Sequence, residues 1–190
     1  MLGGTFDPVH IGHLVVAQEA RHELGLDRVL LVVANDPWQK SAQRPVTAAE
    51  DRLAVVEAAV EGVPGVHASR IEIDRGGASY TVDTLRWLRA AHPGAEQFLI
   101  VGADVVPTLS TWHQASALPE LATLVVARRA GTPEPPDPAG WSVVHLPVPG
   151  LEISSRDLRD RLAGGRPVRF LVPDAAIRCI SARRLYAGWR

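Results

Sequence analysis

The stretch Gly3–His13 reads "GGTFDPVHIGH" and combines a glycine turn with the start of a helix. Glycines let a backbone approach a ligand closely, and the Asp7-Pro8 pair predicts a turn. The residues that follow, "HIGHLVVAQEA" (10–20), have the apolar spacing of a helix that ends near Gly25. Because the first amide groups of a helix and its dipole attract anions, this stretch predicts a phosphate-binding turn.

His10 and His13 lie three residues apart and therefore share one face of that helix. They could hold an anion together, act as two ligands of a zinc ion, or be partly buried helix histidines. A zinc site needs at least one more histidine or carboxylate, and the sequence has no second histidine pair and no HExxH pattern. The glycine turn before the pair favours the anion.

The rest of the chain alternates short apolar runs with amphipathic segments. Runs at 29–34, 97–102 and 123–127 predict strands buried on both faces, and 66–73 is a further predicted strand. Helices are expected around 53–60, after a capping-box spacing of Thr47 and Glu50, and from about residue 80. This alternation predicts an α/β, Rossmann-like doubly wound parallel sheet, with ligands at the carboxyl ends of its strands.

Composition limits the classes of protein that fit. The 190 residues are 46% hydrophobic, which suits one domain over 1–190 with a small helical subregion at about 151–190. Twenty basic against 21 acidic side chains give no field for nucleic acid or an anionic membrane. Cys179 is the only cysteine, and no signal peptide or membrane-spanning run is seen. We therefore expect a cytoplasmic protein that acts on small ligands.

Two later segments carry groups suited to a nucleotide. Ser154 or Ser155 can cap a helix with Arg159 in its first turns, which would direct amide, hydroxyl and guanidinium groups at one anion. A capped structural helix is the alternative. Asp104 follows a predicted strand, where a carboxylate can accept hydrogen bonds from ribose hydroxyls or simply begin a helix.

Two single residues offer further contacts. Lys40 is the only lysine in a chain that otherwise uses arginine, which favours a phosphate contact over a solvated charge. Trp112 offers a flat face to an aromatic ring, although a lone tryptophan also suits core packing.

Several motifs in order carry a family resemblance. Besides "GGTFDPVHIGH", they are "SYTVDTL" (79–85), "GAD" (102–104), "TW" (111–112), "ISSRDLR" (153–159) and "LVPDAAIRCI" (171–180). Together they resemble the HxGH nucleotidylyltransferase superfamily, and in particular the bacterial nicotinate mononucleotide adenylyltransferases. One departure is Arg156, where the family more often has threonine.

The resemblance implies adenylyl transfer from ATP to nicotinate mononucleotide, with pyrophosphate as the second product, in NAD biosynthesis. Mg²⁺ would bridge the ATP phosphates with few protein ligands. The implied catalytic residues are His10, His13 and Arg159. The implied ATP-binding residues are Gly3, Gly4, Thr5, Phe6, His10, His13, Gly102, Asp104, Ser155 and Arg159.

The same resemblance implies a second half-site for nicotinate mononucleotide. Trp112 would stack on the nicotinate ring, and the backbone amides at Thr81 and His113 would receive its carboxylate. Lys40 would contact the phosphate of the mononucleotide or the phosphate tail of ATP. Alternatives are a related enzyme that acts on nicotinamide mononucleotide or phosphopantetheine, and a non-catalytic nucleotide-binding regulator. A possible homo-oligomer is compatible with each of these.

Overall fold

The computed structural model describes residues 1–37, 44–129, 131 and 135–187. These residues form a six-stranded sheet in the order β3-β2-β1-β4-β5-β6, in which every neighbouring pair is parallel. The strands are β1 (Leu2–Gly4), β2 (Val29–Val33), β3 (Val66–Ser69), β4 (Phe98–Gly102), β5 (Thr123–Arg129) and β6 (Val143–Val148). The predicted α/β, Rossmann-like doubly wound sheet is confirmed.

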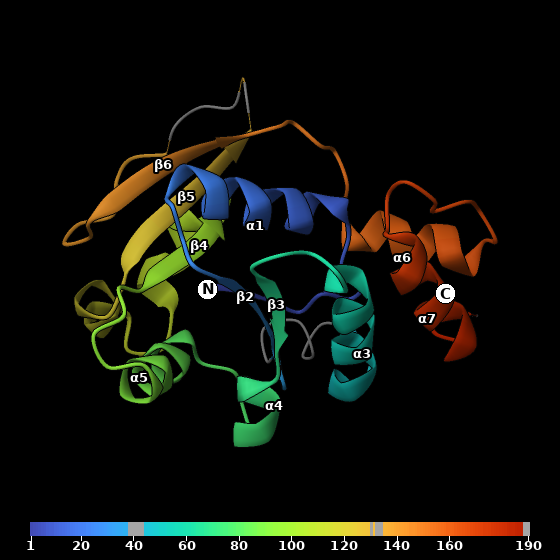
Figure 1. The fold of residues 1–190 in the computed structure, drawn as a ribbon, viewed down its shortest axis with the longest axis horizontal. Coiled ribbons are helices and arrows are strands. Elements are labelled where there is room, and N and C mark those ends of the chain that lie inside the picture. Colours follow the sequence, from blue (N-terminus) through green and yellow to red (C-terminus); the bar gives the residue numbers. More distant parts are fainter. Residues whose placement is uncertain (38–43, 130, 132–134, 188–190) are drawn as a thin grey trace.

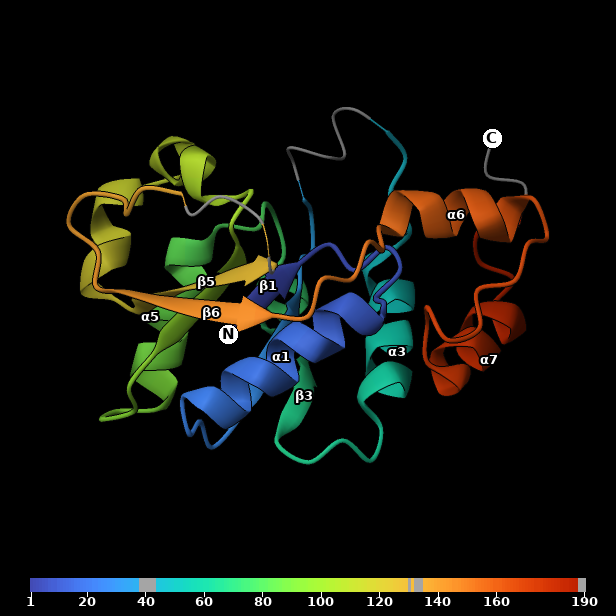
Figure 2. The same ribbon diagram turned by 90° about the horizontal axis from the view of Figure 1, so that it is seen from above.

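Helices cover the sheet, and two C-terminal helices lie beyond it at one end of the molecule. They are α1 (Ile11–Glu23), α3 (Ala49–Val60), α4 (Ile71–Arg75), α5 (Thr81–Ala91), α6 (Ser155–Ala163) and α7 (Asp174–Ala182), with 3₁₀ helices η1 (Val106–Thr111) and η2 (Ala115–Glu120). Figures 1 and 2 show α6 and α7 beside α3 at one end of the molecule, and α5 with the 3₁₀ helices at the other.

Two local predictions are wrong. The strand expected at 66–73 ends at Ser69, and α4 follows, because Glu72 is drawn into the interior by a hydrogen bond from Thr84 (2.6 Å) while Arg70 pairs with Asp74 one helical turn later. The capping box of Thr47 and Glu50 does not form. The helix instead begins after Ala48 without a side-chain cap.

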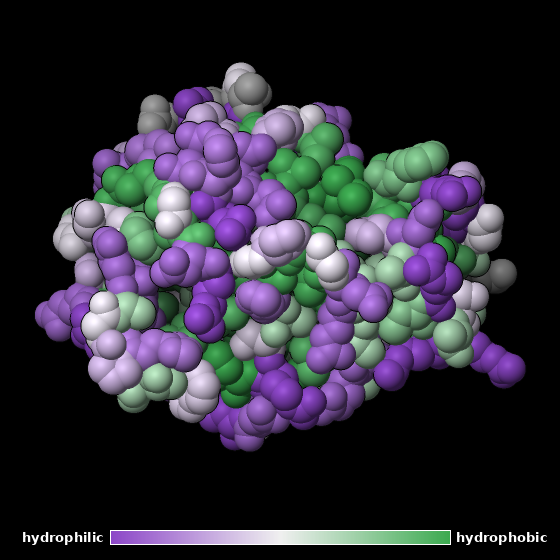
Figure 3. All heavy atoms as spheres, in the orientation of Figure 1, coloured by the Kyte–Doolittle hydropathy of each residue, from purple (hydrophilic) through white to green (hydrophobic). Residues whose placement is uncertain are grey.

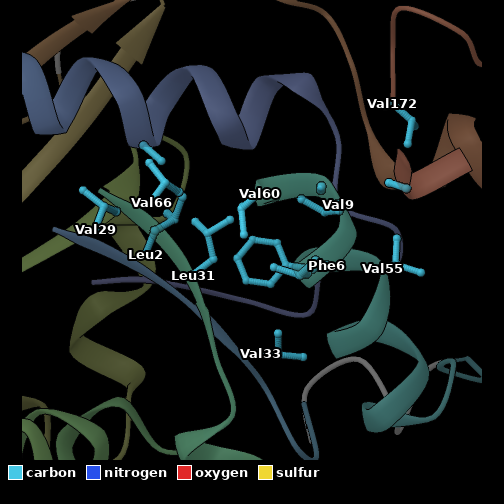
Figure 4. Close-up of a cluster of buried hydrophobic side chains, with 14 of the residues drawn as sticks. Leu2, Phe6, Val9, Val29, Leu31, Val33, Val55, Val60, Val66 and Val172 are labelled. Atoms are coloured by element: carbon cyan, nitrogen blue, oxygen red, sulfur yellow. The ribbon is translucent and has the colours of Figure 1, made fainter. Parts of the chain in front are cut away.

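A hydrophobic cluster holds the glycine turn against the sheet. Figure 4 shows Phe6 among Leu31, Val33, Val55 and Val60, between α1, β2 and α3. Phe6 is 2% exposed and has a left-handed backbone conformation, with φ of 48°. Burying an aromatic side chain contributes about 1.5–3 kcal/mol, which stabilises this unusual turn.

The surface is mostly polar. On the face shown in Figure 3, apolar side chains gather beside α1 and the segment that leads from β6 to α6. Within the described residues, no helix is long and apolar enough to cross a membrane.

Candidate nucleotide-binding site

A cleft lies where the order of the sheet reverses. The chain passes from β1 outward to β2 and β3, whereas β4, β5 and β6 continue on the other side of β1. Ligands of doubly wound sheets bind at this switch point, outside the carboxyl ends of the strands. A cavity of about 220 Å³ lies there, lined by Gly3, Gly4, Thr5, Ala34, Pro37, Glu72, Ser79, Tyr80, Thr81, Leu99, Ile100, Val101, Trp112 and His113. Six residues predicted from the sequence therefore share one cavity.

Glycine is required in the turn for steric reasons. A Cβ built at Gly4 would lie 2.9 Å from the ring of Phe6, which is fixed in the core. A Cβ at Gly12 would lie 3.1 Å from Nδ1 of His10. Both glycines leave room for a ring close to the backbone: that of Phe6 at Gly4, and that of His10 at Gly12 in the first turn of α1.

His10 and His13 form a stacked pair at the N-terminus of α1. Their ring centroids are 3.7 Å apart with an interplanar angle of 26°, and Phe6 meets the His13 ring edge-on at 5.0 Å. The backbone N–H of His10 donates to Nδ1 of His13 (3.2 Å). A neutral His13 therefore carries its proton on Nε2, which makes that atom a hydrogen-bond donor.

His10 is the more buried member of the pair. It is 8% exposed, and its Nδ1 has no hydrogen-bond partner. Burial, and secondarily the positive charge of Arg129 at the end of β5, lower the pKa of His10 from 6.5 to about 4. His10 is thus a neutral imidazole near pH 7.

The turn after β1 is also held from the C-terminal helices. The carboxylate of Asp7 is 1% exposed and accepts hydrogen bonds from Arg44 (2.8 Å) and from the hydroxyl of Tyr186 (3.0 Å). Arg159 donates to the backbone carbonyl of Asp7 (2.7 Å), and Ser155 donates to the carbonyl of Pro8 (2.9 Å). Two predicted ATP-binding residues of α6 thereby contact the turn after β1, at Asp7 and Pro8.

The helix that carries them starts as the sequence suggests. Ser154 is the N-cap of α6 and accepts a hydrogen bond from the backbone N–H of Asp157 (3.1 Å). Arg159 is 6% exposed, and burial is the main cause that lowers its pKa, followed by the charge of Arg44. Its Nη1 also lies 3.9 Å from a carboxylate oxygen of Asp7.

Part of the cavity lining is an aromatic wall formed by Tyr80, Trp112 and His113. Trp112 ends η1 and is half-buried, and the exposed ring of His113 stacks on Tyr80 with centroids 4.2 Å apart. Thr81 is the first residue of α5, so its backbone N–H is one of those that the helix leaves without an internal partner. These aromatic side chains could stack on a planar ring of a ligand, and the free N–H of Thr81 could donate to an anionic group attached to that ring.

Two further predicted residues, Gly102 and Asp104, are not among the residues that line the cavity. Gly102 ends β4, and Asp104 is exposed in the turn that follows it. A Cβ at Gly102 would collide with the carboxylate of Asp104, so this glycine gives that side chain its position. Lys40 lies outside the described residues.

Sequence reasoning missed three buried polar residues. Glu72 lines the cavity and is 5% exposed, Asp7 anchors the turn, and Arg52 on α3 is 1% exposed. A weak signal was available for the last: Arg52 directly precedes the mostly apolar segment "LAVVEAAV" (53–60) of its helix. Charged residues are almost never fully buried unless they are paired.

Comparison with known proteins identifies the family. Residues 1–161 match the family model described as cytidylyltransferase-like. A protein of Frankia casuarinae named "Probable nicotinate-nucleotide adenylyltransferase" is 49% identical over 98% of this chain and 99% of its own length. A protein of Streptomyces coelicolor with the same name is also 49% identical, over 98% of this chain and all of its own length. The chain belongs to the nicotinate-nucleotide adenylyltransferase family.

Solved structures agree on the fold of this family. The Plasmodium falciparum nicotinic acid mononucleotide adenylyltransferase, complexed with NaAD, superposes with a TM-score of 0.80 at 16% identity, over 97% of this chain and 95% of that one. A putative nicotinate-nucleotide adenylyltransferase of Vibrio parahaemolyticus superposes with a TM-score of 0.71 at 19% identity, over 99% of this chain and 94% of that one. The family resemblance predicted from the sequence is confirmed.

Proposed function

We propose that this chain transfers the adenylyl group of ATP to nicotinate mononucleotide, which gives nicotinate adenine dinucleotide and pyrophosphate. The observation that carries the proposal is the stacked His10–His13 pair at the start of α1, which follows the glycine turn that lines the cavity at the switch point of the sheet. Relatives with the name of this activity match over essentially the whole chain.

The reaction needs alignment more than it needs a base. An oxygen of the mononucleotide phosphate, already ionised near pH 7, forms a bond to the α-phosphorus of ATP. The bond from that phosphorus to the oxygen bridging to the β-phosphate breaks, and pyrophosphate leaves with the electron pair. Catalysis of such a step consists of positioning and of neutralising charge on the leaving group.

In this proposal the histidine pair stabilises the charge of the phosphates by hydrogen bonding. The Nε2–H group of His13 would donate a hydrogen bond to an α-phosphate oxygen. The backbone amides in the first turn of α1, which have no partner within the helix, would add further donors. His10 supports the ring of His13 by stacking and offers a neutral imidazole to the phosphates. Because Arg159 donates a hydrogen bond to the backbone carbonyl of Asp7, its role in this proposal is to fix the turn around the phosphates and to add positive charge.

The aromatic wall would select nicotinate over other acceptors. Trp112 would stack on the pyridine ring, and the amides of Thr81 and His113 would donate to the nicotinate carboxylate. A carboxamide would set its NH₂ group against one of these donors and leave a polar group unpaired, which costs about 1–3 kcal/mol. Discrimination of the acid from the amide would arise here.

Magnesium would enter with ATP as part of the substrate complex. Among the residues that the structure describes, no group of three or more His, Cys, Asp or Glu side chains is placed to hold a metal ion. In this proposal the ion would take its oxygen ligands chiefly from the phosphates. The cytoplasmic location and the possible homo-oligomer stay predictions.

The test is pyrophosphate release by the purified chain with ATP and Mg²⁺. Nicotinate mononucleotide, nicotinamide mononucleotide and phosphopantetheine are offered separately, with a reaction lacking any acceptor as control. Fast release with the nicotinate compound and little with the others supports the proposal. Preference for phosphopantetheine or nicotinamide mononucleotide identifies a different acceptor, and ATP binding without any release supports the nucleotide-binding regulator.

A further inference from the structure

A fully buried arginine lies beneath the cavity. Arg52 projects from α3, is 1% exposed, and has the largest side chain among the fully buried residues. Burial is the main cause that lowers its pKa, and the negative charge of Asp7 opposes that effect. Bringing a guanidinium into the interior is costly unless its N–H groups are bonded.

Its nitrogens bond to backbone oxygens of three separate segments. Nη1 donates to the carbonyl of Thr5 (2.8 Å), Nη2 donates to the carbonyl of Asn35 (3.1 Å), and Nε donates to the carbonyl of Thr47 (2.7 Å). The rigid, planar fork of an arginine can reach several acceptors at once, whereas the ammonium of lysine is a single point on a flexible stem. Arg52 therefore fixes the distance between the turn after β1 and the turn after β2.

Each of these two turns leads to a different half of the cavity. Thr5 follows Gly3 and Gly4, and all three line the cavity on the chain segment that leads to the histidine pair. Asn35 leads to the other half, because its backbone N–H donates to the hydroxyl of Ser79 (2.9 Å) and its side-chain amide donates to the carbonyl of Gly77 (2.9 Å).

The second connection continues to the aromatic wall. The backbone N–H of Ser79 donates to the carbonyl of Asp36 (3.1 Å), and Asp36 and Ala78 form a parallel bridge. Ser79 and Tyr80 line the cavity directly before α5 begins at Thr81. A chain of hydrogen bonds thus runs from Arg52 through Asn35 to Ser79, two residues before Thr81, whose amide is proposed to hold nicotinate.

We propose that Arg52 is a positioning residue that sets the spacing between the ATP half-site and the mononucleotide half-site. The inference rests on the proposed function, because it assigns the two halves of the cavity to the two substrates. Arg52 is too buried to reach either substrate. Its removal should therefore impair the joint alignment of the two phosphates more than the binding of each substrate alone.

The size of the effect follows from the geometry of transfer. A misplacement of about 1 Å, caused by a mutation away from the reacting atoms, can slow a reaction about 100-fold. In Arg52→Lys, one ammonium replaces three directed donors, so at least one of the two turns is released. We expect the single-turnover rate at saturating ATP and nicotinate mononucleotide to fall about 10- to 100-fold.

The experiment separates alignment from binding. Titration calorimetry measures the Kd of Arg52→Lys for α,β-methylene ATP and, separately, for nicotinate mononucleotide, and rapid quench measures the single-turnover rate. Each Kd is expected within about threefold of the unmutated protein. A rate within threefold of the unmutated protein overturns the proposal, and so does a rise in one Kd as large as the fall in rate, since Arg52 would then serve one half-site only.

Arg183→Lys is the matched control. Arg183 donates to Asp51, the neighbour of Arg52 on α3, over 2.6 Å, but its side chain is 45% exposed and contacts neither turn. It should keep the unmutated rate. If the unmutated protein itself releases no pyrophosphate with nicotinate mononucleotide, the proposed function fails instead, and the two failures are distinct.

Ser79→Ala tests the same connection if Arg52→Lys does not fold. It removes only the hydroxyl that accepts from the backbone N–H of Asn35, at a half-buried position. A fall in the single-turnover rate that exceeds any rise in either Kd supports the proposal. An unchanged rate overturns it, because the hydrogen-bond connection from Arg52 to the aromatic wall would then carry no alignment.

Discussion

The acid side of the stability curve should depend on one histidine. His10 is 8% exposed, its Nδ1 lacks a partner, and its pKa is about 4 in the folded chain against 6.5 for an ordinary histidine. Between these two values the unfolded state binds a proton that the folded state does not. Stability therefore falls as the pH drops from about 6.5 to about 4.

The expected magnitude follows from the two pKa values. Linkage gives a loss of about 2 kcal/mol between pH 7 and pH 5 from His10 alone, and about 3 kcal/mol once the pH is below both values. His10→Gln keeps a side chain of similar size but removes the titrating ring. The free energy of unfolding in His10→Gln should consequently fall about 2 kcal/mol less between pH 7 and pH 5 than that of the unmutated chain.

Urea unfolding, followed by far-UV circular dichroism at pH 7 and pH 5, measures this difference. Each variant is compared with itself at the two pH values, so a general loss of stability in His10→Gln cancels. His22→Gln removes an exposed histidine from the last turn of the same helix and serves as the matched control. A difference below about 0.5 kcal/mol between His10→Gln and the unmutated chain would refute the reasoning from burial.

Three further predictions concern single contacts. His13→Ala should lower kcat about 100- to 1,000-fold, because it removes a hydrogen-bond donor to the phosphates, and should lower the Tm by only about 2–4 °C. Pyrophosphate release and thermal unfolding measure the two effects. A kcat within tenfold of the unmutated value contradicts the prediction. Trp112→Ala should raise the KM for nicotinate mononucleotide about tenfold and leave that for ATP within twofold in steady-state assays, whereas an effect on ATP alone rules out stacking. Tyr186→Phe removes the hydroxyl that donates to the buried Asp7 carboxylate, and urea unfolding at pH 7 should show a loss of about 1.5–3 kcal/mol; no loss would mean that water replaces the hydroxyl.

Continuous apolar runs made most of the sheet predictable. The predicted strands at 29–34, 97–102 and 123–127 correspond to β2, β4 and β5, because buried parallel strands need no polar face. The strand predicted at 66–73 ends at Ser69, and the reason is a tertiary contact. Its alternation of polar and apolar residues resembles a strand, but a hydrogen bond between Glu72 and Thr84, twelve residues apart, favours the short helix α4.

The site was predictable in its parts but not in its connections. Local spacing places the histidine pair, the start of α5 and the cap of α6, because each depends on residues within one helical turn. Spacing gives no information on partners far along the chain. Arg159 and Asp7 are 152 residues apart, and Ser155 and Pro8 are 147 apart, so these contacts with the turn become visible only in the folded chain.

The turn after β1, within Gly3–His13, is consequently held in its conformation by side chains from other parts of the chain. Gly3 to His13 supplies ligand-facing backbone and two imidazoles, but the carbonyls of Thr5, Asp7 and Pro8 are each held by side chains of other elements. Those side chains come from α3 and α6, with Tyr186 beyond α7 bonding to the Asp7 carboxylate. Because a turn rich in glycine has many accessible conformations when unbound, donors that fix its carbonyls would lower the entropy cost of organising it around the ATP that we propose it binds. Substitution of Arg52, Ser155 or Arg159, which hold these carbonyls, should therefore reduce catalysis even where "GGTFDPVHIGH" is intact. The loss should be in kcat before it is in the affinity for either substrate.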